Sequence, residues 1–580
     1  MYLIEEVSEF TVVRINHQNK PAFRRVAVLT VVFYLFFIAN GHSLVWAAPD
    51  THTVTTSVTV GNAAPAFVSG PAELTASTGA NPTNVGTAVT FQAQAVDGNG
   101  DQYYLAICKG AGITPGNNTA PTCTAGSWCI SSATNSNATA SCSYTTVQGD
   151  AEVNAWYAYV CDKNSSSSCS AASQGSGDSG SPFFVNHPPV FDAISNNAVG
   201  GTNPGNTVVW STSANTKDTD SNTAQDTLSF YVCKTASATA AGCTGETWCS
   251  SVGVASSAPT CSYAIPVPTA DQTYNAYVYL FDSHGMAATG TVSQGTASNF
   301  TVNNVAPVVS AVTLNGGAAI NLNEGTTAPV ILTATVTDNN GCSDLTSVTA
   351  SLYRSGIGYS NCDSAGESND NNCYPVLTCS ATTSCTSADS SATFQCTAYV
   401  QYHADPTDTA TIYEAQNWVD TFAATDNNSA SHTATVAVPV ELNSLIAFSV
   451  NASIAYGSLS TGQTNNLSET STTVVSTGNV GLDMELSGTD MCTDYPTCAG
   501  SKITVSNQKY TLNSTDSYEA ATPLAVSATQ LELNCQKTLV YNSPKEKPIY
   551  WGLRIPDGTP AGTYTGQNTL TAVLGETGDW

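Results

Sequence analysis

The chain has 580 residues, a formal net charge of −28, and only 10% of its residues are charged. This length exceeds what one hydrophobic core can serve and predicts about four domains. The 15 lysines and arginines are scattered singly, which argues against nucleic acid and anionic lipid surfaces as partners. The low content of charged residues favours an extracellular β-rich protein over a cytosolic enzyme.

Residues 1–48 read as an N-terminal lead followed by a secretory signal. Two arginines precede a long apolar stretch that ends in "LVWAA", a small-residue cleavage site. We expect cleavage after Ala47 or Ala48, which leaves no membrane segment, and an initial strand or linker over 49–64. The alternative is an uncleaved anchor, because the apolar stretch approaches membrane-spanning length.

Nineteen cysteines in an exported chain predict a disulfide framework, and their spacing exposes a duplication. The first copy contains "YYLAICKG", "GSWCISS", "ASCSYTT" and "NAWYAYVCD", and the second contains "LSFYVCKT", "ETWCSSV", "PTCSYAI" and "NAYVYLFD". Close spacing predicts local pairs, although four cysteines allow three connectivities. The expected pairs are Cys108 with Cys123, Cys129 with Cys142, Cys233 with Cys243, and Cys249 with Cys261.

The segment "CDKNSSSSC" follows a strand in the first copy only. When the two copies are aligned without gaps, Cys161 and Cys169 correspond to Phe281 and Thr289, so the second copy lacks both cysteines. Cysteines that are gained or lost as a pair most simply bond to each other. We therefore predict a stapled loop rather than a metal clip or a catalytic loop, since no histidine in the segment could activate its serines.

Period-two alternation in each copy, as in Val89, Phe91 and Ala93, predicts half-buried strands. A third unit repeats the plan with "VILTATVTDNNG" and "NWVDTFAATDNN". Short strands between Gly, Pro, Asn and Ser clusters indicate all-β sandwiches. Prolines that follow the last strand of each repeat, and short linkers, predict domains placed end to end in a stiff rod. The predicted domains are 65–187, 188–306, 307–443 and 444–580.

The late strands, followed by "FFVNHPPV" and "FTVNNVAPV", resemble the tandem immunoglobulin-like, cadherin-like or fibronectin-III-like domains of bacterial secreted and surface proteins. The resemblance covers roughly residues 65–443. The last unit, with "STGNVGLDMELSGTDM", is similar to another immunoglobulin-like module. This likeness implies disulfide-stapled immunoglobulin-like sandwiches, and says almost nothing about a ligand, because one fold hosts many functions.

Acidic loops in the first three units suggest calcium. Side-chain oxygens at alternate positions of "DGNGD" and "DTDSN" could surround a hard cation. In an immunoglobulin-like sandwich these loops lie at the same end as the last hairpin and the incoming linker, here Asn186 or Asn303. The linkers lack the acidic residues of cadherins, and the alternative is that these residues only form turns. The candidate ligands are Asp97, Asn99, Asp101, Asp162, Asp218, Asp220, Asn222, Asp282, Asp338, Asp344 and Asp426.

The last unit holds an odd cysteine. We expect Cys492 to bond Cys498 within "CTDYPTC", which leaves Cys535. Its alternation with Leu531 and Leu533 predicts a buried, inert thiol. The competing hypothesis is an intermolecular disulfide.

No catalytic motif appears, and we expect a non-enzymatic protein, secreted or on the cell surface, with an adhesive or structural role. Its partner would be a surface or matrix component, a glycan, or a second copy. The alternative is a carbohydrate-binding or accessory module of an extracellular polysaccharide-acting system, with Trp128 and Trp248 as sugar platforms. An aromatic residue beside a disulfide more often belongs to a core.

Overall fold

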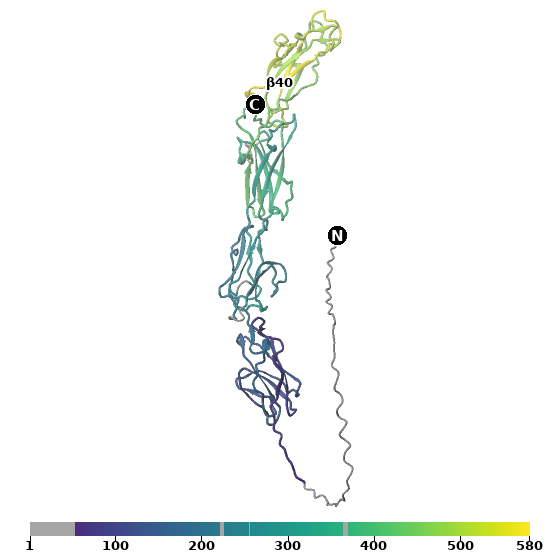
Figure 1. Cartoon of the computed structure of the whole chain (residues 1–580). Helices are drawn as coiled ribbons and strands as arrows, with labels where there is room; N and C mark the ends of the chain where they lie inside the picture. Colours follow the sequence, from purple (N-terminus) through teal and green to yellow (C-terminus); the bar gives the residue numbers. More distant parts are fainter. Residues whose placement is uncertain (1–52, 221–225, 254–255, 363–368) are drawn as a thin grey trace, which may run out of the picture. The chain divides into compact units, whose positions relative to one another are not determined.

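The computed structural model describes residues 53–220, 226–253, 256–362 and 369–580. The predicted signal sequence and Asn222 lie outside these ranges. The predicted fold class is confirmed: the chain is all-β, with tandem immunoglobulin-like sandwiches and nine disulfides. Each sandwich uses one continuous stretch of the sequence, as the colours of Figure 1 show. In the described ranges, no helix has the length and apolarity needed to cross a membrane.

The first sandwich packs the sheet β1-β3-β8 against β10-β4-β7, with β11 joining β2 and β9. Its core gathers Phe91, Leu105, Trp156 and Phe183, all 0% exposed. The elements are β1 (Ala66–Glu73), β2 (Thr83–Asn84), β3 (Ala88–Val96), β4 (Tyr103–Cys108), β5 (Ile113–Thr114), β6 (Thr122–Cys123), β7 (Ser127–Ile130), β8 (Thr139–Thr145), β9 (Val153–Asn154), β10 (Tyr157–Asp162), η1 (Gly177–Ser179) and β11 (Phe183–Asn186).

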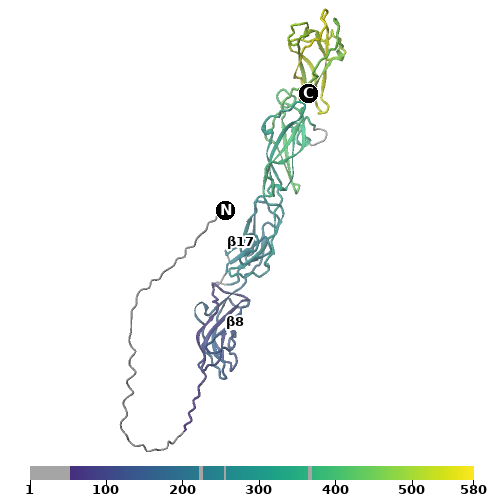
Figure 2. The same ribbon diagram turned by 90° about the vertical axis from the view of Figure 1, so that its right-hand side faces the viewer.

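The second sandwich repeats this plan with the sheets β12-β13-β18 and β17-β14-β20-β21 around Trp210, Phe230 and Phe300. Figure 2 labels β8 in the first sandwich and β17 in the second. The elements are β12 (Ile194–Asn196), β13 (Thr207–Thr212), β14 (Leu228–Cys233), β15 (Ala238–Thr239), β16 (Gly242–Cys243), β17 (Thr247–Val252), β18 (Thr260–Ala264), β19 (Thr273–Tyr274), β20 (Tyr277–Asp282), β21 (Thr296–Ala297) and β22 (Phe300–Thr301).

The third sandwich has two four-stranded sheets, β23-β24-β28-β27 and β26-β25-β29-β30, around Leu352, Trp418 and Phe422. Its elements are β23 (Val308–Leu314), η2 (Asn315–Gly317), β24 (Ala328–Thr337), η3 (Cys342–Asp344), β25 (Leu345–Arg354), α1 (Tyr359–Cys362), β26 (Cys373–Thr378), β27 (Ser380–Ala381), β28 (Ser391–Val400), β29 (Trp418–Asp426) and β30 (Ser431–Thr435).

The fourth sandwich packs β31-β32-β39-β36-β37 against β38-β33-β40, around Leu482, Ile549 and Trp551. Its elements are β31 (Phe448–Ser449), η4 (Leu467–Glu469), β32 (Ser471–Ser476), β33 (Leu482–Gly488), β34 (Met491–Cys492), β35 (Lys502–Ile503), η5 (Val505–Asn507), β36 (Gln508–Thr511), β37 (Thr522–Pro523), β38 (Thr529–Cys535), β39 (Glu546–Leu553), β40 (Asn568–Leu574) and η6 (Thr577–Asp579).

Disulfide loops cover the outer face of one sheet in each of the first two sandwiches. Strand β3 alternates between buried and half-buried residues as predicted, but β14 is buried along its whole length. The prediction of a half-buried strand is wrong there, because the loop closed by Cys233 and Cys243 packs on its outer face. This packing forms a small second core with Tyr231, Tyr279 and Phe281.

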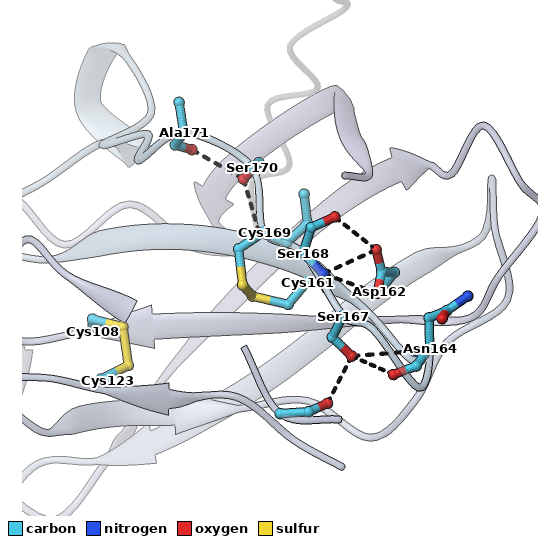
Figure 3. The surroundings of a disulfide bond; sticks show 12 residues. Cys108, Cys123, Cys161, Asp162, Asn164, Ser167, Ser168, Cys169, Ser170 and Ala171 are labelled. Carbon is cyan, nitrogen blue, oxygen red and sulfur yellow. Dashed lines mark hydrogen bonds between the residues drawn. A yellow bond between two sulfur atoms is a disulfide. The ribbon is translucent and has the colours of Figure 1, made fainter. Parts of the chain in front are cut away.

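The structure joins the four pairs expected from spacing, and Cys161 bonds Cys169 as their joint loss in the second copy predicted (Figure 3). Cys161 faces Cys169 across the hairpin, whereas Phe281 faces Ala287, because the first loop is two residues longer. Ala287, not Thr289, is therefore the counterpart of Cys169. Phe281 lies in the second sandwich where the disulfide lies in the first, within the outer-face core.

The remaining cysteines pair in the third and fourth sandwiches. The pairing left open for the third unit is Cys342 with Cys385, Cys362 with Cys373, and Cys379 with Cys396. In the last unit, Cys492 bonds Cys498 as expected. The prediction that Cys535 is a buried free thiol is confirmed: it is 0% exposed, and burial raises its pKa to about 11.

Candidate cation sites at the domain junctions

The linker before the first sandwich is fastened by two side chains of the predicted acidic set. Asn62 donates from Nδ2 to Oδ2 of Asp162 at 2.7 Å, and the Ala63 backbone N–H donates to Oδ1 of Asn99 at 2.9 Å. Asp97 closes the loop by accepting the Asn99 N–H at 2.8 Å. The stapled loop contributes as well, since Ser168 donates to Asp162 through its backbone and hydroxyl (Figure 3).

The linker between the first and second sandwiches uses the same contacts. Asn186 donates to Oδ2 of Asp282 at 3.0 Å, and the His187 N–H donates to Oδ2 of Asp220 at 2.8 Å. Asp218 occupies the position of Asp97 and accepts a backbone N–H at 2.9 Å. Burial raises the pKa of Asp218 to about 6 and also raises the pKa of Asp282.

The linker before the third sandwich repeats the arrangement again. Asn304 donates to Oδ2 of Asp426 at 2.9 Å, and the Val305 N–H donates to Oδ1 of Asn340 at 2.6 Å. Asp338 accepts the Asn340 N–H at 2.8 Å. The third residue of each acidic loop therefore binds the backbone of the linker.

Each of the three junctions leaves the same two oxygens without a hydrogen bond. They are the second oxygen of the first loop aspartate and the side-chain oxygen of the linker asparagine, and both are buried. No described residue donates to either kind of oxygen, and a buried acceptor left unpaired costs about 1–3 kcal/mol. The six atoms are Asn62 Oδ1, Asp97 Oδ2, Asn186 Oδ1, Asp218 Oδ1, Asn304 Oδ1 and Asp338 Oδ2.

The third junction also concentrates carboxylates. One oxygen from each of Asp338, Asp344 and Asp426 lies within 4.8 Å of the others. Burial, followed by the charges of Asp344 and Asp426, raises the pKa of Asp338 to about 6. Asp344 Oδ2 is a further buried oxygen that no described residue serves. Carboxylate and amide oxygens converging in this way suit a hard cation such as calcium.

The second junction contains a histidine pair that the sequence analysis missed. Asp226 accepts from His284 Nδ1 at 2.8 Å and from the Ser283 hydroxyl at 2.7 Å. His187 Nδ1 lies 2.7 Å from Asp220, so both oxygens of Asp220 are engaged by one residue. Asp220 thus positions the linker.

At the fourth junction, a loop asparagine binds the linker backbone as at the third junction, but the loop has no aspartates that match those of the first three junctions. Asn479 accepts the Leu445 N–H at 2.6 Å and donates to the backbone oxygens of Asn443 and Ala404, as Asn340 does at the third junction. Thr477 stands where Asp338 stands. A lysine supplies positive charge nearby, since buried Lys537 donates to Asp405 of the third sandwich.

The predicted third linker contact was Asn303, and the structure places it on Asn304. Asn62 and Asn340 were not predicted. The overlooked signal is a fixed distance, because Asn62, Asn186 and Asn304 each stand three residues before a linker proline. Aligning the linkers on that proline would have selected all three.

Both tryptophans considered as sugar platforms are half-buried and pack against cores. The ring of Trp128 lies 4.9 Å from that of Phe183, and the ring of Trp248 lies 5.0 Å from that of Phe300, edge to face. A lysine ammonium lies over each indole, at 4.1 Å in the first sandwich and 4.5 Å in the second.

No protein-family model and no curated protein matches the chain. Among solved structures, the titin I-band fragment I67–I69 covers 66% of this chain and 98% of its own, at 11% identity and a TM-score of 0.28. Protocadherin gamma B2 cadherin domains 1–5 cover 88% and 81%, at 10% identity and 0.22. The fibronectin(III)-like modules of Clostridium thermocellum CbhA cover 41% and 94%, at 12% identity and 0.18. At these scores the likeness carries no argument about function.

Proposed function

We propose that this chain is an extracellular, non-enzymatic surface protein whose stacked immunoglobulin-like domains serve a structural or adhesive role, with calcium fastening the first three junctions. The observation that carries the proposal is the threefold repetition of the two unserved oxygens. A single turn can leave one acceptor unpaired by chance. Three junctions that leave the same two atoms unpaired call for a common ligand, and those atoms are of the kind that calcium prefers.

The residues present fit such an ion. Each junction offers an amide oxygen from the linker and a carboxylate oxygen from the first loop aspartate. The aspartates that end β10, β20 and β29 accept hydrogen bonds from the same linker asparagines; they are Asp162, Asp282 and Asp426. When bound, calcium supplies positive charge that offsets the burial of these carboxylates and joins the linker to two loops.

An extracellular location is supported by chemistry rather than by likeness. The chain has nine disulfides. Disulfides persist in oxidising compartments and are rare in the cytosol. The partner we propose is a surface or matrix component, a glycan, or another copy of the chain. Cell fractionation of the native protein, with a self-association assay, tests this role directly; recovery only from the cytosol would overturn it.

Calcium binding is tested by calorimetry and thermal unfolding of the secreted chain. Calcium at 100 times its dissociation constant should add about 2.7 kcal/mol to the free energy of unfolding. Asp97→Asn, Asp218→Asn and Asp338→Asn should each remove one site. Glu246→Gln is the matched control, because it makes the same charge change at an exposed carboxylate between β16 and β17, where its partner is Lys234. No calcium-dependent heat, with unchanged stability, would refute the ion.

The rival function, carbohydrate binding, gains little from the tryptophans. Each indole is covered by a lysine on its ring and packed edge to face against a phenylalanine. A sugar would need the face that Lys109 or Lys234 occupies. Binding on a glycan array that is lost in Trp128→Ala, with the domain still folded, would favour the rival.

A further inference from the structure

Three carboxylates meet in the fourth sandwich, on side chains that take no part in the linker contacts of Asn479. Asp483 is in β33, whereas Glu576 and Asp579 lie in the segment that follows β40. One oxygen from each lies within 4.8 Å of the others. Asp483 is 0% exposed and Asp579 is 5% exposed, while Glu576 is exposed and opens the cluster to solvent.

Two of the clustered carboxylates each have a buried oxygen that accepts no hydrogen bond from a described residue. Asp483 accepts the Asn534 N–H through Oδ1 at 2.9 Å, and its Oδ2 accepts no hydrogen bond from the described residues. Asp579 Oδ2 is likewise buried and unserved by them. Each of these oxygens is buried away from water and close to other carboxylates. This arrangement is stable only if the carboxylates share a proton or bind a cation.

The surrounding charge is negative. Burial raises the pKa of Asp483, and Glu576 raises it further. Burial, then Asp483 and Glu576, raise the pKa of Asp579, against a weaker lowering by Lys547. Asp483 and Glu576 also raise the pKa of exposed Glu532. The cluster thus holds three carboxylates with a fourth nearby, and the charge of Lys547 opposes the raised pKa of Asp579 only weakly.

The backbone around the cluster is tight enough to fix its geometry. A Cβ at Gly481 would lie 2.5 Å from the Cβ of Asp579, and the Gly575 N–H donates to the Gly481 carbonyl at 2.8 Å. The Asp579 carbonyl accepts the N–H of Lys537 at 2.9 Å. Because small residues allow this close approach, Asp579 is held against β33 rather than free to turn to solvent.

We propose that Asp483, Glu576 and Asp579 bind one calcium ion, which fastens the segment after β40 to β33. Three carboxylates offer up to six oxygens, each ligating singly or in pairs, and an exposed glutamate gives the ion access. All three ligands come from one sandwich, so this site is independent of the proposed junction ions.

The test uses the full secreted chain with calcium chloride as the only ligand. The background is a variant carrying Asp97→Asn, Asp218→Asn and Asp338→Asn, which removes the junction sites. Calorimetry should still show one bound calcium per chain in this background. Adding Glu576→Gln should weaken that binding by about tenfold or more, since affinity follows the number of charged ligands. Glu546→Gln, an exposed carboxylate in β39, is the matched control and should leave the binding unchanged.

Glu576→Gln is chosen because an exposed side chain can be replaced without disturbing the fold. As a second readout, hydrogen exchange of residues 575–580 should slow with calcium in the background variant, and this slowing should vanish with Glu576→Gln. No calcium bound in the background variant would overturn the site and leave a shared proton, whatever the junctions do. Binding that Glu576→Gln does not weaken would also overturn it. If the unmodified chain binds no more calcium than the background variant does, only the proposed function is refuted.

Discussion

Replacing Lys537 tests whether a lysine holds the fourth junction where we propose that ions hold the other three. The Lys537 ammonium donates to Oδ1 of Asp405, and Arg354 donates from Nε to Oδ2 at 3.0 Å. The three side chains are 3%, 4% and 8% exposed, respectively. Lys537 belongs to the fourth sandwich and the other two residues to the third, so the contact joins consecutive domains.

The expected cost follows from burial. Removing one partner of a buried ion pair costs about 3–5 kcal/mol, because the other charge is left without compensation. In Lys537→Met, Asp405 keeps Arg354, so we expect the lower end, about 3 kcal/mol. Asp405→Asn leaves two buried cations facing a neutral amide, and it should cost about 5 kcal/mol or more.

The assay follows the unfolding of the fourth sandwich in urea, once in saturating calcium and once in chelator. The double variant Lys537→Met with Asp405→Asn should cost less than the sum of the single changes, since it removes both a positive and a negative charge. The cost of each substitution should be the same in calcium and in chelator, because no ion takes part in the contact between Lys537 and Asp405.

A neighbouring histidine gives an independent readout. Burial, and then the charge of Lys537, lowers the pKa of His403 to about 4. In Lys537→Met the pKa of His403 should rise, because a like charge that disfavoured its protonated form is gone. A cost near that of an exposed pair, about 1 kcal/mol or less, with no change at His403, would refute the argument.

Three further predictions follow from other buried groups. Burial raises the pKa of Asp420 from 3.8 to about 7, so the folded chain binds this proton more tightly than the unfolded chain does. The resulting stabilisation is fully present below about pH 4 and is lost as the pH rises to about 7. Asp420→Asn should flatten this slope, on the order of 4 kcal/mol, in thermal unfolding from pH 4 to 8; an unchanged slope would contradict it. Replacing Cys161 and Cys169 by alanine removes the disulfide that closes a loop with a sequence separation of 8. This change should lower the free energy of unfolding, measured in urea, by roughly 2.5 kcal/mol. Phenylalanine at 161 with alanine at 169, the residues of the second sandwich, should recover part of it, and equal stability of both variants would argue against the packing role. Because Cys535 is buried, iodoacetamide should label it only after unfolding, and a reducible dimer that vanishes in Cys535→Ser would overturn its assignment.

The amino-acid sequence determined the features that depend on near neighbours. Alternation in "VTFQAQAV" sets the buried face of β3, since side chains alternate across a strand. The closely spaced cysteines of the duplicated units pair locally, because short loops bring their ends together at small entropic cost. The same holds for Cys492 and Cys498. Joint loss of Cys161 and Cys169 identified their bond without any structure.

Tertiary structure decided what depends on distant segments. The pairing of the cysteines of 342–396 depends on segments that the fold brings together, and spacing did not select Cys342 with Cys385, which are 43 residues apart. Periodicity could not reveal that β14 is buried on both faces, because the pattern within a strand does not show that the next loop, closed by Cys233 and Cys243, folds back over its outer face. Asp483 and Asp579 are brought together only when the segment after β40 closes against β33. A pattern along the chain records which face a residue takes, whereas the partner that meets it there is set by the packing of the whole sandwich.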